Sequence, residues 1–141
     1  MTRRDFQQLA EDRVADAQTL FNARRFDAAY YLAGYSVECA LKACIAKLSR
    51  RHHFPASPES IREIYTHDFN KLSKAAGLLE AFKQARLADN ALDTSWGIVK
   101  DWSEKSRYDR NSGAGMTKAQ SMIQAVADPG HGVLQCIKKY W

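Results

Sequence analysis

The segment from Asp27 to Leu48 constrains the fold more than any other part of the chain. Its apolar side chains recur at gaps of three, four and one, and a second line of small apolar residues widens the apolar surface. A helix that is apolar on most of its sides lies at the centre of a bundle. The segment also carries Glu38 and Lys42, whereas a membrane span needs about 20 mostly uncharged residues. We therefore predict a core helix.

A second long helix is expected before this segment, since apolar residues recur at helical spacing between Arg4 and Asn22. Ser57-Pro58-Glu59 is typical of a helix start. Asp68 is placed to cap a short helix that Gly77 ends. Further helices are expected over 78–88, over 92–106, from a capping box at Thr117 to about 126, and over 133–141.

No segment alternates between apolar and polar residues with period two. Two long helices followed by shorter ones predict an all-α fold, an antiparallel up-and-down bundle. The chain of 141 residues is the length of one ordinary domain, so we expect a single domain over residues 1–141.

The formal net charge of +5 favours an anionic partner such as RNA or a nucleotide. Cys39, Cys44 and Cys136 form no CxxC pair, and no cluster of His, Cys, Asp and Glu has metal-ligand spacing. We therefore predict no disulfide framework, no metal site and no cofactor. No apolar stretch follows the basic N-terminus, so we expect no signal peptide and a cytoplasmic location.

Three segments, taken in order, resemble segments of one known family of helical domains. Residues 25–43 resemble its alanine-rich second helix, in which Glu38 precedes Lys42 by four positions. Thr66-His67-Asp68-Phe69-Asn70-Lys71-Leu72 is similar to its Thr-His-Asp-Leu segment, and Ser106-Arg107-Tyr108 to the Arg-Tyr before its final helix. The family that they resemble is the HEPN domain family, and the resemblance extends over residues 4–127. It implies an antiparallel helical bundle that usually dimerises.

Many members of this family are ribonucleases in toxin–antitoxin or defence systems, and others are non-catalytic partners of small nucleotidyltransferases. The ribonucleases carry an Arg, four to six residues and then a His at the start of the last long helix. In this chain no histidine follows Arg107 or Arg110 until His131. Arg62 and His67 have that spacing, but they lie before or within the Thr-His-Asp segment.

Two interpretations stay open for the catalytic candidates Glu38, His67 and Arg107. Glu38 and Lys42 form either an ion pair on a solvated stripe or the mouth of a cleft in which Glu38 orients an arginine. His67 either hydrogen-bonds the backbone or acts as the base in metal-free RNA cleavage, with an arginine to stabilise the phosphorane.

The loop from Arg107 to Met116 is the candidate phosphate site, because arginine forks and a helix start both favour phosphate. The alternative is that Arg107 pairs with a carboxylate such as Glu38 and holds the loop against the bundle. The residues predicted to bind nucleotide or phosphate are Arg107, Tyr108, Arg110, Asn111 and Lys42.

The C-terminal segment predicts a homodimer, because one small bundle is not expected to cover Val133, Leu134, Ile137, Tyr140 and Trp141. We expect a non-catalytic or weakly active module that binds a nucleotide, RNA or a partner such as an antitoxin or a nucleotidyltransferase. The alternative function is a divergent, metal-independent endoribonuclease.

Overall fold

The computed structural model describes residues 1–49, 64–110 and 115–141. Every regular element in these ranges is a helix, which confirms the all-α fold. The elements are α1 (Arg3–Asn22), α2 (Phe26–Ser49), α4 (Phe69–Ala75), α5 (Leu79–Ala88), α6 (Asn90–Val99), the short 3₁₀ helix η1 (Glu104–Tyr108), α7 (Gly115–Ala127) and α8 (Val133–Lys138). None of the described helices is long and apolar enough to cross a membrane.

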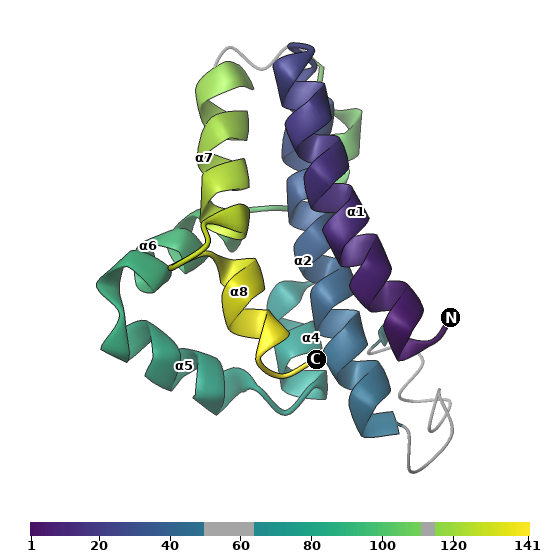
Figure 1. Ribbon diagram of the computed structural model, residues 1–141, viewed down its shortest axis with the longest axis vertical. Helices are drawn as coiled ribbons and strands as arrows, with labels where there is room; N and C mark the ends of the chain where they lie inside the picture. Colours follow the sequence, from purple (N-terminus) through teal and green to yellow (C-terminus); the bar gives the residue numbers. More distant parts are fainter. Residues whose placement is uncertain (50–63, 111–114) are drawn as a thin grey trace.

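Helix α2 lies at the centre of the bundle, as its apolar pattern predicts. Helix α1 runs antiparallel along it, and α4, α7, α8 and η1 also pack against it (Figure 1). The small side chains of α2 let these neighbours approach closely. Along α2 the fully buried residues include Ala29, Ala33, Val37, Ala40 and Leu41.

Two predicted helix boundaries are confirmed and two are corrected. Asp68 caps α4 by accepting a hydrogen bond from the backbone N–H of Lys71 at 3.0 Å. Gly77 then follows α4 with a φ of 70°. The helix expected from Thr117 begins earlier, at Gly115, so Thr117 lies inside its first turn. The helix start at Ser57-Pro58-Glu59 lies outside the described residues.

The second correction concerns the helix expected over 92–106, because α6 ends at Val99. The chain turns there and buries the indole of Trp102, which stacks on Phe69 with ring centroids 5.1 Å apart. The indole N–H donates to the carbonyl oxygen of Tyr31 at 3.2 Å. Burial of a large aromatic ring outweighs one more turn of helix, and it fixes the position of η1 over α2.

The C-terminal apolar face is covered by the chain itself. Val133, Leu134 and Ile137 of α8 are buried in the core, which removes them as a reason to expect a dimer. Two contacts tie the end of the chain to α1. The guanidinium of Arg3 donates to the carbonyl oxygen of Trp141, and the ammonium of Lys138 contacts the carboxylate of Glu11.

A histidine–carboxylate pair joins the α7–α8 turn to the start of α6. His131 Nδ1 lies 2.7 Å from a carboxylate oxygen of Asp89, which also caps α6. The hydrogen bond and the charge of Asp89 raise the pKa of His131 above 6.5. The hydrogen bond from His131 and those from the α6 backbone hold the pKa of Asp89 below 3.8.

This pair predicts a pH dependence of stability. Because the folded-state pKa of His131 is raised, its contribution is fully present below its unfolded pKa and is lost as pH rises through the folded pKa. Replacing His131 by Gln should therefore reduce the fall in Tm between about pH 6 and about pH 9. Thermal unfolding of both proteins across this range measures the effect. An identical pH dependence in the two proteins would contradict the assignment.

Candidate functional site

Glu38 lies on the face of α2 that meets the segment before α4, and its side chain is only 1% exposed. Its two carboxylate oxygens have different partners. One accepts a hydrogen bond from the ammonium of Lys42 at 2.7 Å, and the other lies 2.8 Å from Nδ1 of His67. The predicted ion pair between Glu38 and Lys42 is thus present, but it is buried and not solvated. Glu38 also orients a histidine, not the arginine of the alternative interpretation.

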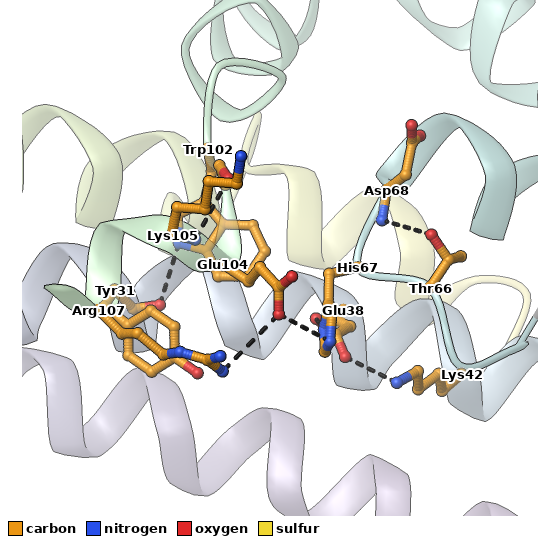
Figure 2. A network of polar contacts seen from close by, with 11 residues as sticks. Tyr31, Glu38, Lys42, Thr66, His67, Asp68, Trp102, Glu104, Lys105 and Arg107 are labelled. Carbon is orange, nitrogen blue, oxygen red and sulfur yellow. Dashed lines mark hydrogen bonds and ion pairs between the residues drawn. The ribbon is translucent and has the colours of Figure 1, made fainter.

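His67 is held between two carboxylates that come from different parts of the chain (Figure 2). Its Nδ1 faces Glu38, and its Nε2 lies 2.9 Å from a carboxylate oxygen of Glu104 in η1. A neutral imidazole has one N–H donor, so only the doubly protonated ring can donate to both acids at once. The expectation that His67 bonds the backbone is replaced by this side-chain network.

The network continues from Glu104 to Arg107, one turn further along η1. The same oxygen of Glu104 that contacts His67 lies 3.7 Å from a guanidinium nitrogen of Arg107. Arg107 therefore pairs with Glu104, not with Glu38. The predicted catalytic candidates His67, Arg107 and Glu38 are thus brought into one row, with Glu104 as the link that sequence reasoning missed (Figure 2).

On its other side Arg107 lines a pocket of about 580 Å³ that we call the arginine pocket. Its walls come from the α1–α2 turn, from η1 and the residues after it, and from the start of α7, all at one end of the bundle (Figure 1). The pocket is lined by Arg24, Arg25, Phe26, Asp27, Ala28, Tyr31, Ser106, Arg107, Asp109, Arg110 and Gly115.

Two arginines of this pocket, Arg24 and Arg25, were not among the predicted site residues. They occupy the turn between the two long helices, and their backbone N–H groups donate to the carbonyl oxygens of Phe21 and Leu20 at 2.9 and 2.8 Å. This is the Schellman pattern that ends a helix. A basic pair at a predicted helix junction is the signal that could have found them.

Arg24 has a left-handed backbone, with a φ of 62°. A glycine is the usual residue at this position of the motif, and a residue with a Cβ costs roughly 1–2 kcal/mol there. The guanidinium of Arg24 lies 5.6 Å from the ring centroid of Phe26. The sequence therefore keeps a large cation where a glycine would be more stable.

The other predicted phosphate-binding residues have different positions. Arg110 lines the arginine pocket, whereas Lys42 lies at the opposite end of the network, bonded to Glu38. Tyr108 is exposed, with its ring centroid 4.8 Å from the guanidinium carbon of Arg107. A side-chain hydrogen bond with Tyr108 raises the pKa of Arg107. Asn111 lies outside the described residues.

A larger cleft of about 640 Å³ borders the network from the side of α4, α5 and α6. His67 and Glu104 line it at one place, and the cations Arg86 and Lys100 line it elsewhere. Among the described residues, no group of three or more His, Cys, Asp or Glu side chains could hold a metal ion. The acidic residues and the Lys and Arg residues that line the cleft are thus equal in number, whereas arginines outnumber aspartates by four to two in the lining of the arginine pocket.

The helical order, the buried Glu38 and the Thr-His-Asp segment beside it agree with one family. The family model for the HEPN domain matches residues 4–126, which is most of the chain. The chain belongs to the HEPN domain family. HEPN domains are generally associated with RNA-related and toxin-type functions, and they often dimerise. No curated protein and no solved structure shows significant similarity to this HEPN domain.

Proposed function

We propose that this HEPN domain is a module that binds RNA or a nucleotide without cleaving it, with the arginine pocket as its phosphate site. Residues 1–141 act as one domain in the cytoplasm, within a toxin–antitoxin, defence or nucleotidyltransferase-associated system. Four guanidinium groups from two parts of the chain support the binding half of this proposal. Arginine forks suit phosphate oxygens, which accept paired hydrogen bonds.

The observation that supports the non-catalytic half of the proposal is the pair of contacts that the His67 ring makes. A general base must offer a free ring nitrogen within hydrogen-bond reach of the proton it removes. Both ring nitrogens of His67 contact carboxylates, at 2.8 Å and 2.9 Å. A histidine held in this way is suited to joining α2 to η1 and poorly suited to accepting a proton from an RNA hydroxyl.

A second candidate function is metal-independent RNA cleavage. It is favoured by the chain of contacts that connects His67 to Arg107 through Glu104, and by the partial exposure of both side chains. If substrate binding drew Glu104 away, His67 would regain a free nitrogen beside a cation. Apo geometry alone does not exclude a catalytic group, because catalytic hydrogen bonds often form only in the substrate complex.

Three proteins separate the two functions: wild type, Arg107→Ala and His67→Ala. We expect Arg107→Ala to weaken binding of RNA or nucleotide about tenfold or more, since a charge-assisted hydrogen bond contributes roughly 1.5–3 kcal/mol. Binding should also weaken steeply as salt rises. His67→Ala should lower Tm and leave affinity nearly unchanged. RNA binding, RNA cleavage with and without a chelator, and Tm are measured for each.

The same experiment contains the outcome against the module. RNA cleavage by wild type that survives the chelator and disappears in His67→Ala would establish the ribonuclease instead. A loss of stability in Arg107→Ala with no change in binding would reduce Arg107 to a structural partner of Glu104.

The proposed partners are a second copy of this chain and either an antitoxin or a nucleotidyltransferase. Because α8 buries its own apolar face, the surface for a homodimer must lie elsewhere. The exposed side chains of Tyr65, Leu87 and Met116 are apolar positions that remain for such contacts.

A further inference from the structure

The arginine pocket differs from an ordinary basic surface in its charge balance. Four arginines and two aspartates, Asp27 and Asp109, line it, so its lining residues carry a formal net charge of +2, and Arg107 also contacts Glu104 outside the pocket. An internal phosphodiester of RNA carries a charge of −1. A phosphate monoester carries about −1.5 to −2 at pH 7 and presents three strong acceptor oxygens. The pocket therefore matches the charge of a monoester.

A buried hydroxyl in the pocket wall also indicates a missing partner. Ser106 is only 8% exposed. Its Oγ has no hydrogen-bond partner among the described residues. Buried polar groups in native proteins are nearly always hydrogen-bonded, so an orphan of this kind requires a reason. Ser106 lies next to Arg107 and lines the same pocket, and its hydroxyl would reach a phosphate oxygen there only if the side chain turned toward the pocket.

The backbone of Arg24 supplies an independent observation. A left-handed, non-glycine residue persists where the surrounding structure holds it there, and such strain gathers at functional sites. At this position a glycine would end α1 at lower cost, but it would remove one guanidinium from the pocket. The strain is explained if Arg24 binds an anion.

We propose that the arginine pocket binds a phosphate monoester, the terminal phosphate of an RNA strand or of a free nucleotide, in preference to an internal phosphodiester. This inference rests on the proposed function and specifies its ligand chemistry. Arg24 and Arg25 bind the phosphate from the α1–α2 turn, and Arg107 and Arg110 bind it from η1 and the residues after it.

The test compares one short RNA in three forms: with a 5′-phosphate, with a 3′-phosphate and with hydroxyl groups at both ends. AMP and adenosine form a second pair. Affinities are measured by fluorescence anisotropy at one ionic strength, with AMP and adenosine as competitors. We expect a terminal phosphate to strengthen binding about tenfold or more, which corresponds to one charge-assisted hydrogen bond or more. Competition by AMP identifies a free nucleotide as a source, and its absence points to the RNA end.

The sharpest variant is Arg24→Gly. It should lose the preference for a terminal phosphate while raising Tm, because glycine adopts the left-handed backbone without strain. A rise in Tm excludes misfolding as the cause of the lost binding. The matched control is Arg4→Ala, which removes the same charge from an exposed position in the first turn of α1. Helix α1 has 20 residues, so this control lies roughly 30 Å from the pocket, and the preference should persist.

The outcomes separate this inference from the proposed function. Equal affinity for all three RNAs, with binding still lost in Arg107→Ala, would overturn the monoester site and leave the RNA module intact. Preferential binding of AMP over adenosine, without any binding of RNA, would support the monoester site and exclude RNA as its ligand. No binding of any RNA or nucleotide would overturn both.

Discussion

Replacing Glu38 by Ala is expected to lower the free energy of unfolding by roughly 3–5 kcal/mol, the usual cost of removing one partner from a buried ion pair. Two groups lose their partner together. The side chain of Lys42 is only 13% exposed, so its ammonium stays largely shielded from water without its carboxylate. His67 loses the contact that joins α2 to the segment before α4. Denaturant unfolding monitored by circular dichroism measures the change.

The matched control for this prediction is Glu104→Ala. It removes the other carboxylate that contacts His67, but Glu104 is partly exposed, and pairs of that kind contribute about 0–1 kcal/mol. Comparing the two variants therefore separates the effect of burying the carboxylate from the effect of its contact with His67. A similarly small loss of unfolding free energy in both variants would show that burial of the Glu38 ion pair does not stabilise the fold.

The second large effect is expected for Gly34→Ala. A Cβ at position 34 would lie 2.1 Å from Cδ1 of Trp102, and two further indole atoms are within 2.4 Å. The ring has little freedom to retreat, because it stacks on Phe69 and donates its N–H to Tyr31. Overpacking of this kind costs about 1–3 kcal/mol and occasionally more. We expect the upper part of that range, together with a displaced η1.

Gly97→Ala is the control for the same chemical change in another helix. Nothing lies within 4 Å of a Cβ at that position, so the change in α6 should stabilise the protein by roughly 0.5–1 kcal/mol. Unfolding free energies and near-ultraviolet circular dichroism of the two variants report stability and the packing of Trp102. A stable Gly34→Ala protein with an unchanged tryptophan signal would mean that α2 and Trp102 are further apart.

Most of the fold follows from local sequence signals. The spacing of apolar residues in α1 and α2, the cap at Asp68 and the stop at Gly77 each depend on a few neighbouring residues. The errors arose where a contact distant in sequence decides the structure. Trp102 leaves the helical path because Phe69 and Tyr31 are placed to receive it, and no pattern between residues 92 and 106 records this.

The candidate site was predictable as a set of residues but not as an arrangement. The HEPN resemblance singled out Glu38, His67 and Arg107, and the structure aligns them through Glu104. The burial of the Glu38 side chain could not be inferred from the sequence, because a Glu and a Lys four positions apart most often form a solvated pair. Arg24 and Arg25 were missed because their role depends on a turn that meets η1 only in the folded chain.

The contacts of α1 with α8 and the C-terminal residue determine how this protein can be attached to a surface or a fusion partner. Arg3 bonds to Trp141, so both chain ends lie near each other and away from the α1–α2 turn (Figure 1). A biotin tag or a fused reporter at either end would therefore project away from the arginine pocket. Immobilised through its tag, the molecule would present that pocket to solution, and either terminus would serve equally well.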